Sequence, residues 1–100
     1  MATAMKPQGK DQALEERISR ILIGAVDLHC HSGPSVMARD LNHLEALEEA
    51  AQAGLSAMQL KDHYYSATPI TALLSQTHGH LGVALFSGVP LNNANGSFNK

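Results

Sequence analysis

Three segments of the chain carry apolar residues at helical spacing, and each is followed by a short apolar run typical of a buried strand. The first predicted helix begins at Asp11, a capping residue, and ends at Gly24. Its apolar face consists of Leu14, Ile18, Ile21 and Leu22. The first predicted strand covers residues 25–29, and a loop rich in small residues follows it.

The second predicted helix has clear signals at both ends. Asp40 is its expected N-cap, and Gly54 follows its last turn. The apolar positions that repeat between them are Leu41, Leu44, Leu47 and Ala51. The second predicted strand then covers residues 56–62.

The third predicted helix starts with Thr68 as N-cap and Pro69 at the first helical position. Its apolar positions are Ile70, Leu73 and Leu74. Gly79 is expected to end this helix, and the third predicted strand covers residues 81–86.

This alternation of helix and strand predicts βαβ units and a parallel sheet. Three parallel strands have two exposed edges, and a complete eight-fold barrel needs about 250 residues. We therefore expect an α/β chain that forms the first three βα units of a TIM-type barrel, with a leading N-terminal helix. Residues 1–10 are expected to be a disordered lead-in and residues 11–100 the N-terminal part of the barrel. A complete small α/β domain is the alternative.

Composition limits the classes of partner and compartment. The apolar share of 44% is that of an ordinary globular chain, and the net charge of -2, with dispersed basic residues, excludes nucleic acid as a partner. A single cysteine builds no internal disulfide, which fits the cytoplasm. No segment resembles a signal peptide or a membrane helix. The expected partner is a small-molecule substrate, and a homo-oligomer of the complete protein stays open.

A histidine pair carries the strongest chemical signal. His29 and His31 lie where the first predicted strand gives way to a loop, and residues two apart on a strand point to the same side. Neutral imidazole binds zinc and similar cations, which make water a nucleophile near neutral pH. Active sites of parallel α/β sheets gather at this end of the strands. The pair indicates a divalent metal, zinc first, with manganese and iron as alternatives.

The second predicted strand ends in Lys61-Asp62-His63 at the same end of the sheet. Neighbouring parallel strands end side by side, so His63 is expected to complete the ligand set of His29 and His31. Lys61 shares the parity of His63 and is expected to face the same cavity, as a salt-bridge partner, a general base or a modified ligand. Asp62 is expected to point the other way.

Asp27 has the parity of the two histidines, one layer deeper along the strand. Its carboxylate is expected to orient a ligand imidazole or to contact the metal itself. An ion pair with Lys61 is the alternative. Asp27 and Lys61 are therefore the candidate catalytic residues.

These residues resemble a known group of enzymes. Asp27-Leu28-His29-Cys30-His31-Ser32 is similar to the opening motif of the polymerase-and-histidinol-phosphatase (PHP) family, and the His-x-His element also opens the wider amidohydrolase superfamily. Lys61-Asp62-His63 resembles the Thr-Asp-His of the second PHP strand. With Gly33-Pro34-Ser35, Arg39 and Leu91-Asn92, residues 21–98 look most like uncharacterised amidohydrolase-related proteins. The resemblance implies a βα barrel with one to three divalent metals, a hydrolytic reaction, and His29, His31 and His63 as metal ligands.

Two positions depart from the PHP pattern. Residues 87–90 hold no Glu where PHP proteins place a metal-binding carboxylate, and Lys61 replaces a threonine. Both departures bear on phosphoesterase activity more than on metal binding. The carboxylated lysine of the amidohydrolase pattern lies on a later strand, so it does not transfer to Lys61.

Four other side chains are assigned no chemistry. Cys30 has the opposite parity to its neighbouring histidines and is expected to face the helices as a small buried residue. His78-Gly79-His80 repeats the spacing of the first pair but precedes its strand, at the end of the sheet that serves stability. His43, in the first turn of a helix, is expected to face solvent.

Substrate contacts are expected from the loops. The planar fork of Arg39 suits a carboxylate or phosphate, although an ordinary surface cation next to Asp40 is the alternative. The further candidates at the mouth of the pocket are Tyr64, Tyr65, Asn92 and Asn93. Arg39, Tyr64 and Asn92 are the substrate-binding residues we expect.

The complete barrel is therefore expected to be a metal-dependent hydrolase that attacks an amide, lactone or similar carbonyl bond. This chain alone is expected to be inactive, because the remaining ligands and the general base would come from later strands. A PHP-type phosphoesterase is one alternative. A non-catalytic metal- or ligand-binding barrel is the other.

Overall fold

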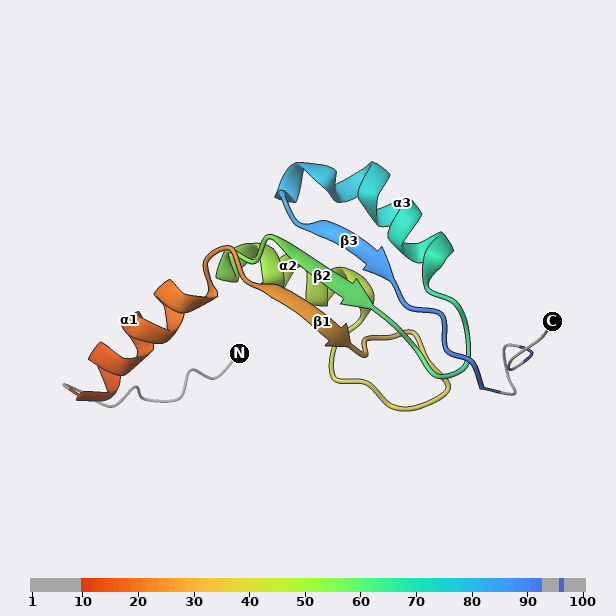
Figure 1. Ribbon diagram of the computed structural model, residues 1–100, viewed down its shortest axis with the longest axis horizontal. Coiled ribbons are helices and arrows are strands. Elements are labelled where there is room, and N and C mark those ends of the chain that lie inside the picture. Colours follow the sequence, from red (N-terminus) through yellow and green to blue (C-terminus); the bar gives the residue numbers. More distant parts are fainter. Residues whose placement is uncertain (1–9, 93–95, 97–100) are drawn as a thin grey trace.

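The computed structural model describes residues 10–92 and residue 96, and it confirms the predicted alternation of helices and strands (Figure 1). The elements are α1 (Lys10–Leu22), β1 (Val26–Cys30), α2 (His43–Ala53), β2 (Ala57–Leu60), α3 (Thr68–His78), the 3-10 turn η1 (Gly79–Leu81) and β3 (Ala84–Ser87). The expected disordered lead-in lies outside the described residues, except for Lys10, which is the first residue of α1.

The three strands form one parallel sheet in the order β1-β2-β3. Its register aligns Val26 with Ala57, and Ala57 with Ala84, so the carboxyl ends of all three strands lie at one edge. The expected α/β class and parallel pairing are therefore confirmed. The order follows the chain without reversal because each helix returns the chain to the amino end of the next strand.

The hydrophobic core lies on one face of the sheet. The face of β2 that carries Met58 and Leu60 is almost inaccessible to solvent, and α2 lies behind β1 and β2 (Figure 1). The buried core cluster consists of Ala46, Leu47, Ala50, Met58, Leu60, Ala67 and Val83. The opposite face is open, since Val26, Leu28 and Phe86 are 52%, 70% and 58% exposed.

The start of α2 differs from the sequence expectation. Its N-cap is Asn42 and not Asp40, because Asn42 completes a capping box. Asn42 Oδ1 accepts a hydrogen bond from the Glu45 backbone N–H at 2.7 Å, and Glu45 Oε1 accepts one from the Asn42 N–H at 3.0 Å. At the other end Gly54 closes the helix as expected, with a φ of 82° that favours glycine.

The predicted start of α3 is displaced by one residue. Ala67 occupies the N-cap position, and Thr68 is the first helical residue. The backbone N–H of Thr68 is instead bonded to the hydroxyl of Ser66, at 3.3 Å. The Thr68 hydroxyl lies 2.8 Å from that of Ser87, which links the start of α3 to the end of β3.

The second and third strands are shorter than expected. Gly79 is the C-cap of α3, as expected, but the chain then continues into η1 and turns at Gly82, whose φ is 79°. Leu81 therefore belongs to η1, and β3 begins at Ala84. In the same way β2 ends at Leu60, so Lys61, Asp62 and His63 belong to the following loop.

The helix α1 lies apart from the rest of the molecule (Figure 1). It begins at Lys10, so Asp11 lies in its first turn and is not its cap. Every residue from 11 to 22 is exposed, including the predicted apolar face, and the molecule is correspondingly long, at 56 × 27 × 24 Å. Among the described residues, no helix is both long and apolar enough to cross a membrane.

Candidate functional site

The two histidines at the end of β1 meet through their ring nitrogens. His29 Nε2 and His31 Nε2 are 2.8 Å apart, with an angle of 59° between the rings. Two imidazole nitrogens approach so closely when one donates a proton to the other, or when both direct lone pairs at one cation. Ligands of a tetrahedral zinc ion, each at about 2.0–2.1 Å, lie about 3.3 Å apart. The 2.8 Å spacing is that of a hydrogen bond, and two ligands of one zinc ion would lie about 0.5 Å further apart.

His63 joins this pair from the loop after β2. Its ring stacks on that of His31, with centroids 4.6 Å apart and an angle of 20° between the planes. The stacked rings turn their faces to each other, so their nitrogen lone pairs do not point at a common centre. Within the described part of the chain, no three His, Cys, Asp or Glu side chains are arranged to hold a metal ion. The structure gathers the three imidazoles but shows no complete coordination set.

An irregularity in β1 changes the expected position of Asp27. Asp27 pairs with Met58 and Cys30 with Leu60, so β1 carries one more residue than β2 across this interval. Both partners on β2 belong to the core. Asp27 therefore does not share a face with the histidines by simple alternation. Its Oδ1 accepts a hydrogen bond from the backbone N–H of His29 at 2.9 Å, and it pairs with neither an imidazole nor Lys61 in the described structure.

The environment of His31 favours its neutral form. Burial lowers the pKa of His31 below its usual value, and the nearby His63, His29, Arg39 and Lys61 lower it further. Its Nδ1 atom is buried and has no hydrogen-bond partner in the described part of the chain. The uncharged imidazole is the form that binds metals. His31 is therefore in its metal-binding, neutral form at neutral pH. The side chains around it include the cations Arg39 and Lys61.

Arg39 points inward and is not the surface cation of the alternative reading. Its Nη2 lies 3.9 Å from Oδ2 of Asp62, whose side chain is fully buried. Burial raises the pKa of Asp62, but hydrogen bonds from Ser35 and the Tyr64 N–H, together with Arg39 and His63, hold it below its usual value. Among the residues that the structure describes, the Nε and Nη2 atoms of Arg39 have no hydrogen-bond partner.

A cavity of about 360 Å³ lies beside Arg39. It is lined by Cys30, His31, Ser32, Ala38, Arg39, Asp40, Leu41 and Ala46. The cavity therefore joins the guanidinium to one of the histidines. This arrangement suits a small molecule that carries an anionic group.

The side chain of Lys61 packs closely against Gly88, a residue that the sequence did not single out. A Cβ added to Gly88 would lie 2.8 Å from the Cβ of Lys61 and 2.9 Å from Nε2 of Gln59. The missing side chain thus makes room for the stem of Lys61 on the open face of the sheet. A glycine directly after a strand was the only signal, and it is a weak one because such glycines usually mark turns.

His43 is buried, so the expectation that it faces solvent is wrong. It is 3% exposed, and its Nδ1 and Nε2 lie 2.5 Å from the hydroxyls of Ser32 and Tyr65. Helical position alone does not show which face a loop will cover, and here the loop after β1 closes over the first turn of α2. His43, Ser32 and the buried Asp62 are site residues that periodicity could not identify.

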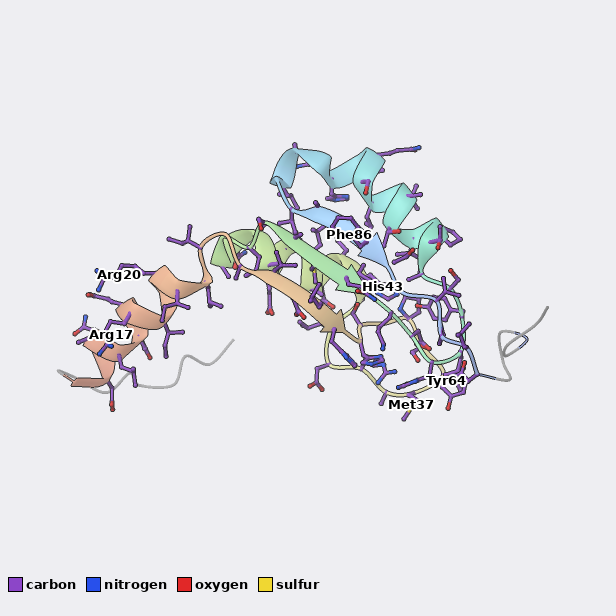
Figure 2. All side chains as sticks on the ribbon, viewed as in Figure 1. Arg17, Arg20, Met37, His43, Tyr64 and Phe86 are labelled. Atoms are coloured by element: carbon purple, nitrogen blue, oxygen red, sulfur yellow. The ribbon has the colours of Figure 1, made fainter. Side chains whose placement is uncertain are left out.

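The remaining loop candidates differ in exposure. Tyr64 and Asn92 are exposed, and Figure 2 shows Tyr64 at the outer edge of the strand-end loops, with His43 nearer the tip of β2. Tyr65 is directed inward, and its hydroxyl donates to the carbonyl oxygen of Pro34 at 2.5 Å. Asn93 lies outside the described residues. The contact of Tyr64 and Asn92 with a substrate stays a prediction.

Two further expectations concern residues without a chemical role. Cys30 packs against the core as expected, and burial raises the pKa of its thiol. His78 and His80 precede β3, and their rings stack at 5.9 Å. Nδ1 of His78 lies 2.8 Å from the hydroxyl of Thr77. These histidines belong to the amino end of the sheet, opposite to the candidate site.

Comparison with known proteins yields one finding. A family model described as "Family of unknown function (DUF6282)" matches residues 24–100. Neither a curated protein nor a solved structure matches the chain. The matched range includes every candidate site residue and begins after the end of α1.

Proposed function

We propose that this chain, which belongs to the DUF6282 family of unknown function, is part of a metal-dependent hydrolase. The observation that carries the proposal is the cluster of imidazoles at the ends of two neighbouring parallel strands. His29 and His31 approach to 2.8 Å, and His63 stacks on His31 at 4.6 Å. Clustered neutral imidazoles suit zinc first, with manganese or iron as alternatives.

The residues present fit the start of such a site. Nε2 of His29 and Nε2 of His31 would hold the cation, and His63 is the nearest further imidazole. Asp27 would help to orient this pair, because its carboxylate accepts a hydrogen bond from the backbone N–H of His29. When bound, a divalent cation would polarise a carbonyl group and lower the pKa of water.

The proposed reaction adds water across an amide, lactone or similar carbonyl bond. The oxygen of water forms a bond to the carbonyl carbon, the bond to the leaving nitrogen or oxygen breaks, and a proton passes to the leaving group. Lys61 would hold the transferred proton at its Nζ, because it lies near enough to His31 for its charge to lower the pKa of that histidine. Arg39 would bind an anionic group of the substrate, with Tyr64 and Asn92 at the exposed rim.

We further propose that the three strands are the first part of a TIM-type barrel. Two features support this proposal. The strands follow the chain in parallel order, and the core lies on one face, while Val26, Leu28 and Phe86 leave the other face apolar and open. In a barrel this second face would be the packed interior.

A phosphoester is the second candidate substrate. The positive charges of Arg39 and Lys61 both lower the pKa of His31, so both lie near it. A negatively charged phosphate group would be attracted to these two charges. Against this candidate, residues 87–90 supply no carboxylate for a further metal. Carbonyl hydrolysis therefore stays the primary proposal.

Elemental analysis of the purified protein tests the metal. We expect near-stoichiometric zinc, manganese or iron, and its loss in a folded His29→Ala/His31→Ala double variant. The matched control is His78→Ala/His80→Ala, which removes a pair of identical spacing from the other end of the sheet and should keep the metal. Equal metal content in both double variants would contradict the proposal.

A substrate panel then tests the reaction. Cyclic amides and lactones, compared with phosphoesters, separate the two candidate chemistries. Turnover that persists unchanged in the His29→Ala/His31→Ala variant would rule out the proposed mechanism. In the longest natural version of the protein, stoichiometric metal without turnover on any substrate would instead favour a non-catalytic metal-binding protein.

A further inference from the structure

A continuous chain of hydrogen bonds runs through the loops beneath the candidate site. Ser32 Oγ lies 2.5 Å from Nδ1 of His43, Nε2 of His43 lies 2.5 Å from the hydroxyl of Tyr65, and that hydroxyl donates to the Pro34 carbonyl at 2.5 Å. Ser32 and His43 are 1% and 3% exposed. Each link joins segments that are distant in the sequence.

The number of protons available determines which group donates and which accepts in each of these hydrogen bonds. The hydroxyl of Tyr65 has one proton and gives it to Pro34, so it accepts from His43, and Nε2 of His43 carries a proton. Burial lowers the pKa of His43, although Asp62 opposes the effect, so the ring is neutral and Nδ1 is an acceptor. Ser32 must then donate to Nδ1. Each ring nitrogen of His43 has one defined partner.

The two ends of the chain lie next to the histidines of the site. Ser32 follows His31 directly, and Tyr65 follows His63 by two residues. The backbone around His43 adds to the link, since its N–H donates to the Gly33 carbonyl at 2.6 Å. One buried imidazole thus ties together the two loops whose histidines stack at 4.6 Å.

We propose that His43 is a positioning residue that holds the loops of His31 and His63 in register through Ser32 and Tyr65. The inference rests on the proposed function, because it assigns these loops to a metal site. Residues that orient metal ligands typically change affinity by about 10- to 100-fold when they are replaced. A purely structural role for His43 would affect folding but not the mutual placement of the two rings.

The test compares Tyr65→Phe and His43→Gln with the wild-type chain. Tyr65→Phe keeps the aromatic ring and removes only the hydroxyl that joins His43 to Pro34, so it stays informative if His43→Gln fails to fold. The matched control is His78→Gln, the same substitution at a histidine whose ring nitrogen lies 2.8 Å from the hydroxyl of its neighbour Thr77 and whose ring stacks on His80. The readouts are the dissociation constant of Co²⁺ and the nuclear Overhauser effect between the rings of His31 and His63.

We expect both variants to bind Co²⁺ about 10- to 100-fold more weakly and to lose the Overhauser contact, while His78→Gln retains both. Unchanged Co²⁺ affinity together with an unchanged contact in a folded Tyr65→Phe overturns the inference. If the wild-type chain binds no Co²⁺, the proposed function fails, and the ring contact alone decides. In that case its loss in Tyr65→Phe supports the positioning role, and its persistence overturns it.

Discussion

His43 couples folding to pH through its protonation state. Burial lowers the pKa of His43 in the folded chain, whereas an unfolded histidine titrates near 6.5. At a pH between the folded and unfolded pKa values, the unfolded chain binds more protons than the folded chain. The contribution of His43 to stability is therefore complete above pH of about 6.5 and is lost as the pH falls from there toward the folded pKa. His31 has a lowered pKa and acts in the same direction.

Urea unfolding measured from pH 8 to pH 5 checks this prediction. The unfolding free energy of the wild-type chain should fall below pH of about 6.5, and it should fall less in His43→Gln, with His31 supplying the remaining slope. His78→Gln is the control and should follow the wild type. A steeper loss of stability in His43→Gln than in the wild type would contradict the assignment of a lowered pKa.

The residues of the site divide into those that a strand pattern reveals and those that it does not. His29, His31 and His63 were identifiable because they follow predicted strands, where side chains of neighbouring strands meet. His43 was not identifiable, since its partners come from two loops whose path no periodicity encodes. Asp27 was misplaced because one extra residue in β1 interrupts the alternation on which its parity depended.

At the scale of elements, the start of α2 depends on one capping residue. Replacing Asn42 by Ala removes the bond to the Glu45 N–H and breaks the capping box. We expect Asn42→Ala to lower the unfolding free energy by about 1 kcal/mol. Asp40→Ala, at the position that the sequence favoured, should change it by less than about 0.5 kcal/mol. Thermal or urea unfolding of both variants measures the difference, and equal losses would contradict the assignment.

The elements themselves were predictable because their apolar periods differ clearly, whereas their ends depend on local turns. Gly54 was found because a left-handed φ strongly favours glycine after a helix. The start of β3 was missed because Gly82, and not Gly79, makes the left-handed turn, after a 3-10 turn that no apolar period marks. Gly79 and Gly82 look alike in the sequence, but the first follows α3 and the second follows η1.

At the scale of the whole molecule, the sheet has one covered face and one open apolar face. Leu28 and Phe86 are exposed on it, and within the described residues β1 and β3 leave unpaired edges. We expect the chain to associate at micromolar concentrations, because burying such a face removes apolar area from water. Sedimentation velocity over a range of concentrations measures the association.

Polar substitutions on this face provide the comparison. Leu28→Gln/Phe86→Gln should reduce the association, since both side chains lie on the open side of the strands. The control is Val36→Gln, at a loop residue that is 82% exposed and belongs to no strand. A monomeric wild-type chain, or equal association in all three proteins, would show that the open face does not drive self-association.

The separation of α1 from the sheet has a consequence for the cooperativity of the chain. A helix whose residues 11–22 are all exposed gains little from tertiary burial, so its population is governed mainly by the helix–coil equilibrium of its own 13 residues. Helices of that length are marginal in water when isolated. The N-terminal segment and the sheet are therefore two thermodynamic units: α1 can melt and re-form many times while the strands, their core and the histidine cluster stay folded.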